Sequence, residues 1–392
     1  MDAEPGTSPS QPPTIYDVAR VARVSIASVS RVLNGQRNPR ADTRERVLAA
    51  VAELGFVPDG AARALSARLK EVVGVVVRRP RWDPDSQFLD VDESLQFPDM
   101  INRGMEIVAQ RHGFDLLVRS VDLDEPDAGR RIFALARKSD GLILHDRVLS
   151  PDELDRLSRQ VPVVTLAGTP TPTTANVHGD NQAGMRELAR HLIVDHGYLT
   201  LGYLAGHEGS PDSLARARTL TEEAAAAGAN LVQGAQWRGS YQAAGGARAM
   251  ERLIASGAAL PRAIVCANDQ SAMGVLHALA EHGIAVPGDV AVTGFDDIPV
   301  ARHLHPQLTT VRQSIQDLGA TAFETVYAMI RGGDPAAQST RGRDIALPTA
   351  LMRRQSCGCG LQGGAQRLLP GQPQSRSQAG PAAAPGNAEE AD

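Results

Sequence analysis

The chain has 392 residues, enough for two or three domains, with ordinary apolar content, few aromatic residues and a formal net charge of −5. The charge is uneven, because residues 14–70 hold ten Lys/Arg and five Asp/Glu, a net +5, which leaves −10 for the remainder. A basic segment on an acidic body excludes a uniformly polyanion-binding protein and favours a single module for a polyanion such as DNA.

The cysteines and the termini exclude further classes. Cys266, Cys357 and Cys359 are too few for a disulfide framework. No other Cys or His pair at zinc-finger spacing accompanies Cys357 and Cys359, so we expect reduced thiols and neither a metal nor a cofactor. No apolar run approaches the length of a membrane span, and the acidic, Pro/Ser-rich N-terminus is unlike a signal peptide. These features predict a cytoplasmic protein with no membrane partner.

Three helical patterns follow a polar N-terminal tail. The first two cover Ile15–Ala22 and Ile26–Leu33 and are joined by a very short link, and the third covers Thr43–Leu54. Ser25 is placed to cap the second helix, and Gly55 stops the third. This spacing is typical of a helix-turn-helix, whose second helix is presented to the major groove. Together with the local positive charge, it predicts a DNA-binding head.

From Val72 onward, short β-branched runs alternate with amphipathic helices. Such alternation predicts parallel sheets covered on both faces, and two successive sets predict two α/β subdomains with a ligand crevice between them. The expected strands lie at 72–77, 115–118, 141–144, 161–166, 200–206, 231–233, 263–269 and 290–296. The expected helices lie at 99–113, 127–138, 151–159, 182–196, 214–227, 242–256 and 271–281.

Residues 14–68 resemble the head of the lac repressor (LacI/GalR) family of transcriptional regulators. The matching motifs are TIYDVARVARVSIASVSRVLN (14–34), DTRERV (42–47), ELGFVP (53–58) and AARAL (61–65). Residues 72–355 are similar to the periplasmic-binding-protein-like core of the same family. The matching motifs there are AND (267–269), VAVTGFDDIPVA (290–301), PQLTTVRQ (306–313) and LPTALMRRQSCG (347–358).

The resemblance implies the domain organisation. We expect a disordered tail at 1–13, a helix-turn-helix domain at 14–58, a hinge helix at 59–70 and a disordered tail at 357–392. An effector-binding and dimerisation domain would cover 71–356. Its N-subdomain would hold about 71–174 and 308–345, and its C-subdomain about 175–307 and 346–356.

For the head, the resemblance implies DNA contacts by Ser25, Ile26, Ala27, Ser28, Ser30, Arg31 and Asn34. Arg31 can pair with O6 and N7 of guanine, which is worth about 1–3 kcal/mol of discrimination. Ile26 and Ala27 carry no side-chain donor, so they can only touch thymine methyl groups or exclude polar edges, and a place in the core of the head is the alternative for Ile26. The serines and Asn34 would hold phosphates or position the helix.

Two further features of the head follow from the resemblance. Arg23 stands where the family has a turn glycine, so a positive φ there would cost on the order of 1 kcal/mol. Its side chain would contact a phosphate or be solvated. The hinge, too short to be a stable helix alone in water, would fold on DNA beside its twin, with Leu65 wedged into the minor groove and Arg63 beside it. An ordinary linker is the alternative.

In the effector domain, the resemblance implies ligand contacts by Phe97, Arg216, Tyr241, Asn268 and Asp296. Polar groups at strand ends can pair with ligand hydroxyls, and aromatic side chains can form a wall. Asp296 follows a strand and would otherwise cap the next turn. An acidic insert at 82–93 precedes Phe97, and its carboxylates would bind hydroxyls or be solvated.

The sequence thus predicts a sequence-specific DNA-binding transcriptional repressor, a homodimer on palindromic double-stranded DNA, controlled by a small-molecule effector. By resemblance the effector is a carbohydrate, and a purine or other metabolite acting as corepressor is the alternative; the sign of regulation stays open. A transport-type binding protein does not fit the basic head. An enzyme is not expected, because no nucleophile elbow, phosphate loop or metal-ligand cluster accompanies the carboxylates.

Overall fold

The computed structural model describes residues 13–33, 39–56, 69–78, 96–121, 127–145, 147–332 and 341–360. The predicted contacts Asn34, Arg63 and Leu65 lie outside these residues, as do nearly all of the predicted hinge and tails and the whole insert at 82–93. Among the described helices, none combines the length and the apolar character that crossing a membrane requires.

The N-terminal head is a small three-helix domain. Its helices are α1 (Ile15–Ala22), α2 (Ile26–Leu33) and α3 (Ala41–Leu54), so the predicted bounds of the first two are confirmed. Val18, Val29 and Val47, one from each helix, are fully buried and form the centre of the apolar core. The Oγ of Ser25 accepts a hydrogen bond from the backbone N–H of Ser28 at 3.2 Å, which confirms the predicted cap of α2.

Arg23, the residue between α1 and α2, has φ 53° and ψ 49°, the left-handed conformation that glycine adopts without strain. We therefore expect Arg23→Gly to raise the free energy of unfolding of the head by about 1 kcal/mol. Amide hydrogen exchange in α1 and α2 should then slow about fivefold. Arg20→Gly, the same change inside α1, should speed exchange by a similar factor. Faster exchange in Arg23→Gly would contradict this expectation. It would show that contacts of the Arg23 side chain stabilise the head by more than the left-handed backbone conformation destabilises it.

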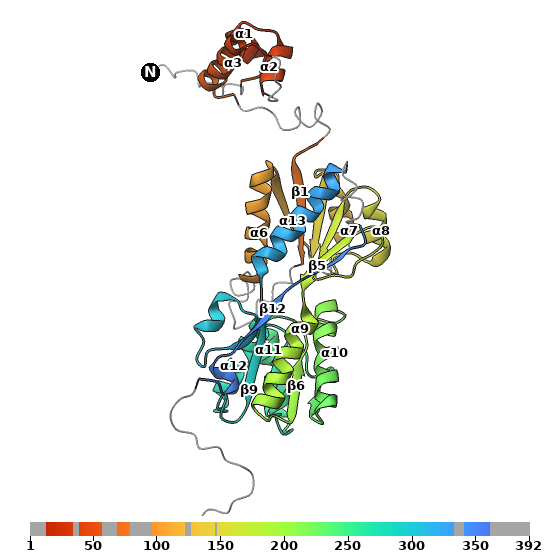
Figure 1. Ribbon diagram of the computed structural model, residues 1–392, viewed down its shortest axis with the longest axis vertical. Coiled ribbons are helices and arrows are strands. Elements are labelled where there is room, and N and C mark those ends of the chain that lie inside the picture. The colour runs from red at the N-terminus through yellow and green to blue at the C-terminus, as the bar shows by residue number, and fades with distance from the viewer. Residues whose placement is uncertain are drawn as a thin grey trace, which may run out of the picture. The chain divides into compact units, whose positions relative to one another are not determined.

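The first lobe is a parallel sheet with helices on both faces. The strand order is β11-β5-β4-β3-β1-β2, and every neighbouring pair is parallel. Helices α6 and α13 pack on one face and α7 and α8 on the other (Figure 1). The strands are β1 (Val72–Arg78), β2 (Asp115–Val121), β3 (Gly141–His145), β4 (Val163–Leu166), β5 (Ala175–Gly179) and β11 (Asp344–Leu347). The helices are α6 (Gln96–His112), α7 (Ala128–Ala136), α8 (Pro151–Ser158) and α13 (Ile315–Arg331).

The second lobe repeats this architecture. Its strand order is β12-β10-β9-β8-β6-β7, parallel except that β12 runs antiparallel to β10. The strands are β6 (Thr200–Leu204), β7 (Asn230–Val232), β8 (Ala263–Cys266), β9 (Ala291–Asp296), β10 (Thr309–Gln313) and β12 (Thr349–Met352). The helices are α9 (Asn181–Arg190), the π-helical turn η1 (His191–Asp195), α10 (Pro211–Ala226), α11 (Ala243–Ala255), α12 (Asp269–Glu281), and the 3₁₀ turns η2 (Pro299–Arg302) and η3 (Gln355–Cys357). The predicted α/β core of two subdomains is therefore confirmed.

The three predicted subdomain boundaries and the start of the C-terminal tail differ from the structure. Strand β5, which was not predicted, belongs to the first sheet, so the first boundary lies after residue 179 instead of 174. Strand β10 belongs to the second sheet, so the next boundary lies after residue 313 instead of 307. Strand β11 of the first sheet ends at Leu347, so the last boundary lies after residue 347 instead of 345. Residues 357–359, assigned to the tail, belong to the second lobe, where Cys357 is fully buried. The chain changes lobe only after completing a strand, and no sequence motif marks that point.

Candidate functional site

Helix α2 presents one face to solvent. Ser25, Ile26, Ala27 and Arg31 are exposed, and Ser28 is half-buried. Ile26 is 41% exposed, which excludes its alternative place in the core of the head. Ser30, also predicted to contact DNA, is half-buried between these residues. This face therefore has the composition expected of a helix that binds in the major groove, namely one arginine, small hydroxyl side chains and short apolar side chains.

Sequence reasoning missed an exposed aromatic residue on this head. Tyr16, in the first turn of α1, is 68% exposed although its ring is large and apolar. A phenol hydroxyl can donate a hydrogen bond to a phosphate oxygen, and phosphate contacts of this kind fix the register of a helix on DNA. We therefore add Tyr16 to the candidate contacts.

A cavity of about 320 Å³ lies between the two lobes. Four of its polar residues come from the carboxyl ends of strands in both sheets, where ligands of open α/β folds bind. Arg78 ends β1, His145 ends β3, Asp296 ends β9 and Gln313 ends β10. The volume is at the lower end of the range of about 300–1,000 Å³ for small-molecule pockets, so the cavity suits a small metabolite.

All five ligand contacts predicted from the sequence line this cavity. Phe97 comes from the first turn of α6 in the first lobe, and the other four, Arg216, Tyr241, Asn268 and Asp296, come from the second lobe. The structure thus brings residues 97 and 296 to one space, although about 200 positions separate them in the sequence. Asp269, the residue after Asn268, lies outside the lining and is fully buried.

Arg216 is held in place by its own lobe. Its Nε donates to Oδ1 of Asn181 at 2.7 Å, and one terminal nitrogen donates to the carbonyl of Ala267. Its other terminal nitrogen lies 3.3 Å from Oδ2 of Asp212, and the guanidinium covers the ring of Phe295 at 3.6 Å. Three of its five N–H donors are thus committed, which leaves two for a ligand among the described contacts.

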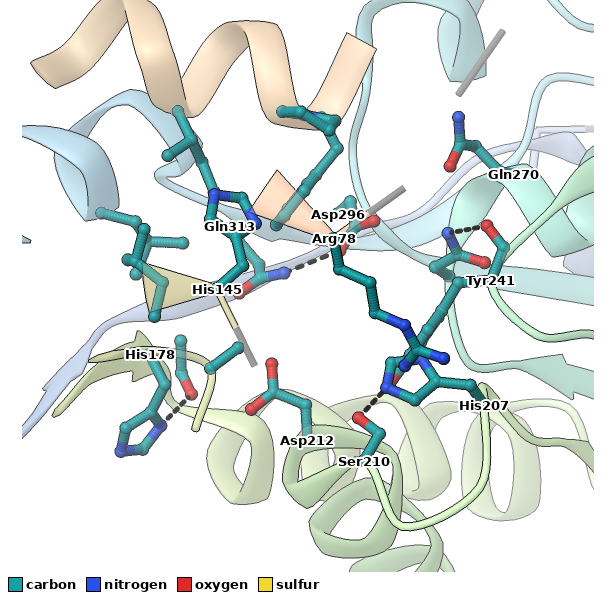
Figure 2. Close-up of a pocket in the computed structure, with 18 of the residues that line it drawn as sticks. Arg78, His145, His178, His207, Ser210, Asp212, Tyr241, Gln270, Asp296 and Gln313 are labelled. Atoms are coloured by element: carbon teal, nitrogen blue, oxygen red, sulfur yellow. Dashed lines mark hydrogen bonds between the residues drawn. The ribbon is translucent and has the colours of Figure 1, made fainter. Parts of the chain in front are cut away.

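Asp296 combines burial with backbone strain. Its Oδ1 accepts a hydrogen bond from Nε2 of Gln313 at 2.7 Å (Figure 2). Burial raises its pKa to about 7, although nearby Arg216 opposes that rise. Its φ is 121°, a conformation that L-residues rarely adopt, and strain of this kind collects at ligand sites. A carboxylate held in this way can accept hydrogen bonds from ligand hydroxyls.

Tyr241 and Asn268 form one side of the cavity together. The hydroxyl of Tyr241 is 2.9 Å from Oγ of Ser210, and its carbonyl accepts from Nδ2 of Asn268 at 3.1 Å. The Oδ1 of Asn268 accepts from the backbone N–H of Ser271, so Asn268 also caps α12. The ring of Tyr241 lies against Gly206, where any Cβ would come within 2.2 Å of it. Tyr241 is therefore a fixed wall of the cavity.

Several polar residues of the lining were not predicted as ligand contacts. They are Arg78, His145, His178, His207, Ser210, Asp212, Gln270 and Gln313. His145 is the most informative, because its Nε2 is buried and has no hydrogen-bond partner within the described part of the chain. Burial lowers the pKa of His145 to about 4, so the ring is neutral at pH 7. Its position directly after a predicted strand was the signal that could have found it.

The formal charges of the lining balance. Two guanidinium groups, of Arg78 and Arg216, face two carboxyl groups, of Asp212 and Asp296. Burial raises the pKa of Asp212 as well, while Arg216 and Asn181 counteract this. A site with balanced charges and many hydroxyl, amide and imidazole groups favours an uncharged polar ligand over an anion.

Comparison with known proteins adds independent findings. Residues 14–59 match the family described as "Bacterial regulatory proteins, lacI family", and residues 189–357 match the "Periplasmic binding protein-like domain". The chain is similar to the HTH-type transcriptional regulator GalS of Salmonella typhimurium, with 35% identity over 350 residues, which are 88% of this chain and 96% of GalS.

Two solved structures are similar over nearly the same length. One is the Lac repressor dimer bound to operator and the anti-inducer ONPF, with a TM-score of 0.74, 26% identity, and coverage of 88% of this chain and 99% of that one. The other is the complex of the transcriptional regulator CelR with cellobiose, with a TM-score of 0.61, 27% identity and the same coverage.

Proposed function

Because the chain belongs to the lacI family of bacterial regulatory proteins, we propose that it is a sequence-specific transcriptional repressor whose operator affinity is set by a small molecule between its lobes. The observation that carries this function is the presence, in one chain, of an exposed helix α2 on a basic head and a polar cavity between two lobes. Its relatives GalS and Lac repressor are regulators, so we propose no reaction for the cavity.

On DNA, the protein acts as a homodimer on a palindromic operator. One small head contacts too little DNA for tight specific binding, whereas two heads read two half-sites. The similar Lac repressor structure is a dimer on its operator, which supports this mode. In each head, Arg31 forms hydrogen bonds with a guanine. Ile26 and Ala27 make apolar contacts with the edges of the neighbouring bases. Such binding takes place where the chromosome is, which for a bacterium is the cytoplasm.

The effector is a carbohydrate. Its hydroxyls pair with Asp296, with Asn268 and with the two remaining donors of Arg216, while Phe97 and Tyr241 cover its apolar faces. The buried Nε2 of His145, in the first lobe, accepts a hydrogen bond from one ligand hydroxyl. The balanced charge of the lining and the similar structure with bound cellobiose support this class.

The effector acts at the point where the lobes are joined. Gly179 and Gln313, at two of the chain crossings, both line the cavity, and a Cβ on Gly179 would come within 2.1 Å of Oε1 of Gln313. Gln313 in turn holds Asp296. A ligand that pairs with Asp296 therefore contacts a residue that is hydrogen-bonded to one of the segments joining the lobes. Such a ligand shifts operator affinity if it favours one arrangement of the lobes.

Effector affinity is expected to rise with pH. In the free protein the pKa of Asp296 is about 7, and hydroxyl donors of a bound sugar lower it, because they stabilise the carboxylate. Binding therefore releases a proton, and the dissociation constant should fall about tenfold between pH 6 and pH 8. Calorimetry in buffers of different ionisation enthalpy measures both effects. An affinity that falls as pH rises would contradict the carboxylate role.

The function is tested by measuring binding of the purified protein to DNA upstream of its own and neighbouring genes, at fixed salt. A panel of neutral sugars and purines is then added. We expect tight binding to a palindromic site and its release by one sugar. If only a purine weakens or strengthens binding to the palindromic site, the effector is a purine and not a carbohydrate. The absence of any specific DNA binding would refute the repressor function.

A further inference from the structure

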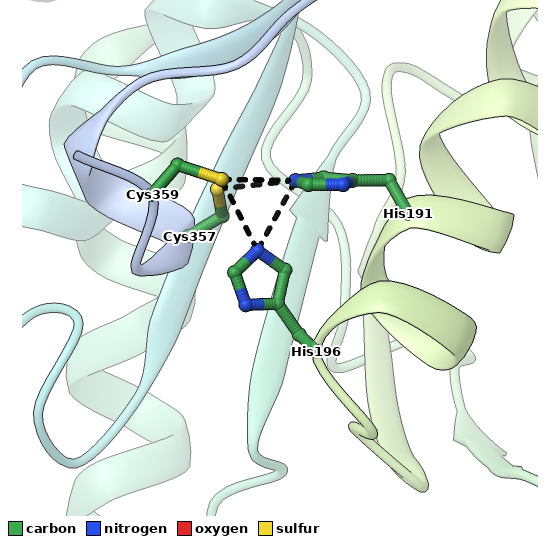
Figure 3. Close-up of side chains that lie close together, drawn as sticks. All are labelled: His191, His196, Cys357 and Cys359. Atoms are coloured by element: carbon green, nitrogen blue, oxygen red, sulfur yellow. Dashed lines mark hydrogen bonds between the residues drawn. The ribbon is translucent and has the colours of Figure 1, made fainter. Parts of the chain in front are cut away.

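Four side chains able to bind a metal ion meet in the second lobe, apart from the cavity between the lobes. His191 and His196 lie at the start and just beyond the end of η1, and Cys357 and Cys359 lie at and after the end of η3 (Figure 3). His191 is 3% exposed and Cys357 is fully buried. The two pairs come from segments more than 160 residues apart in the sequence.

The separations of the four ligand atoms suit a tetrahedral site. The Nε2 of His191 lies 3.1 Å from Nε2 of His196 and 3.5 Å from each Sγ, and Nε2 of His196 lies 3.4 Å from Sγ of Cys359. All four atoms lie within 4.8 Å of one another. Ligand atoms bound tetrahedrally at about 2.0–2.3 Å from a zinc ion are about 3.3–3.8 Å apart, so only small side-chain adjustments are needed.

The contacts of His191 place its Nε2 at the centre of the cluster. Its Nδ1 is 2.8 Å from Oδ2 of Asp195, and an ionised carboxylate only accepts, so Nδ1 carries a proton and Nε2 is the nitrogen that faces the other three side chains. His196, Cys357 and Cys359 all converge on this Nε2. The Sγ of Cys357 also accepts from the hydroxyl of Thr309 at 3.0 Å and donates to the carbonyl of Arg354 at 3.3 Å. One cation between the four ligand atoms would be bound by all of them.

The backbone is shaped to bring the ligands together. In an α-helix, residues five apart point about 140° away from each other. The π-turn η1, closed by the hydrogen bond from the N–H of His196 to the carbonyl of His191 at 3.2 Å, returns His196 to the side of His191. Between the cysteines, Gly358 has φ 105°, which lets the chain turn so that both thiols face the histidines. A Cβ there would meet Tyr198 at 3.3 Å and His196 at 3.5 Å.

Surrounding residues fix the ligands in the way that neighbours of metal sites do. Asp195 orients the ring of His191, and Arg353 lies 3.7 Å from the same carboxylate oxygen. Tyr198 stacks on His196 with ring centroids 5.1 Å apart and donates to the carbonyl of Cys357 at 2.9 Å. The pairing of a histidine ligand with a carboxylate on its other nitrogen is common at zinc sites.

We propose that His191, His196, Cys357 and Cys359 bind one zinc ion, which ties the C-terminal end of the second lobe to the turn after α9. Two thiolates and two imidazoles select a thiophilic cation such as zinc over magnesium or calcium, which prefer oxygen ligands. All four tetrahedral positions are taken by protein, so the ion is structural and leaves no position for a substrate. This role is independent of the operator and the effector.

The test uses the full-length protein, purified without chelators in the presence of a reductant. Elemental analysis is expected to find about one zinc per chain. Replacement of zinc by Co²⁺ should give the visible bands of tetrahedral cobalt and a sulfur-to-cobalt charge-transfer band. Chelation should lower the Tm of the wild-type protein. The Asp195→Asn protein should keep the cobalt spectrum but bind metal about 10- to 100-fold more weakly.

The cysteine variants decide the assignment. Cys359 is only partly buried, so Cys359→Ser should fold, lose most of the charge-transfer intensity and no longer lose Tm on chelation. Cys266→Ala is the matched control, because it removes the buried thiol in β8 and should leave the metal content and the cobalt spectrum unchanged. The proposal fails if the reduced wild-type protein binds neither zinc nor cobalt, if it holds a Cys357–Cys359 disulfide instead, or if Cys359→Ser binds metal as the wild type does.

Discussion

Arg31→Ala is expected to remove most of the discrimination between operator and unrelated DNA. Arg31 is exposed on α2, and it is the only residue of the predicted contacts described on that helix with a bidentate donor fork. Each arginine–guanine pair is worth about 1–3 kcal/mol, so two half-sites should lose about 2–6 kcal/mol of specificity. Anisotropy titrations with operator and with scrambled DNA at one salt concentration measure the two affinities and hence their ratio.

Arg31→Lys is the matched control for this change. It keeps the positive charge, and therefore the salt dependence of binding to any DNA, but it cannot make the same bidentate pair. We expect Arg31→Lys to lose discrimination nearly as fully as Arg31→Ala, while binding to scrambled DNA stays close to that of the wild type. If Arg31→Ala kept the wild-type ratio of affinities, base readout by this arginine would be refuted.

Asp296→Asn is expected to separate effector binding from operator binding. The amide keeps the shape of the side chain but cannot act as a carboxylate acceptor, and hydrogen bonds to a charged group are worth about 1.5–3 kcal/mol each. Effector affinity should therefore fall about 10- to 100-fold and become independent of pH between 6 and 8, while operator affinity without effector stays unchanged. Calorimetric titration with the identified sugar gives the dissociation constant.

Stability provides the control for Asp296→Asn. The unfolded carboxyl group titrates near 3.8 and the folded one near 7, so the folded state binds more protons between these values. Ionised Asp296 therefore costs the ligand-free protein stability as pH rises through this range, and the amide removes that cost. We expect Asp296→Asn to be at least as stable as the wild type at pH 8. The exposed Asp317→Asn of α13 should leave effector affinity unchanged. A wild-type effector response in Asp296→Asn would refute the assigned role.

Features that depend on nearby residues could be predicted from the sequence. The bounds of α1 and α2, the cap at Ser25 and the exposed position of Arg31 follow from apolar spacing within one turn or two. Asp296 and Asn268 were predicted because the family resemblance implies them, and their places at strand ends agree with the rule that ligand groups collect there in parallel sheets.

Features that depend on distant pairing could not be predicted. Strand β5 gives a weak pattern, since Asn176 and His178 interrupt its apolar residues, and only the flanking strands show that it is a strand. The fixed position of Arg216 depends on Asn181, which lies 35 residues away. The histidines beside Cys357 and Cys359 were not predicted because they lie more than 160 residues before the cysteines, and only the fold brings the two pairs together.

The most direct test of effector-controlled operator binding is a closed thermodynamic cycle. Operator affinity is measured with and without a saturating effector, and effector affinity is measured with and without saturating operator. Coupling between two sites is reciprocal, so both affinities must change by the same factor, which we expect to lie between about 5 and 150. Equal factors would establish that the cavity and the head share one equilibrium. An effector that binds in the cavity while leaving operator affinity unchanged would contradict the proposed regulation.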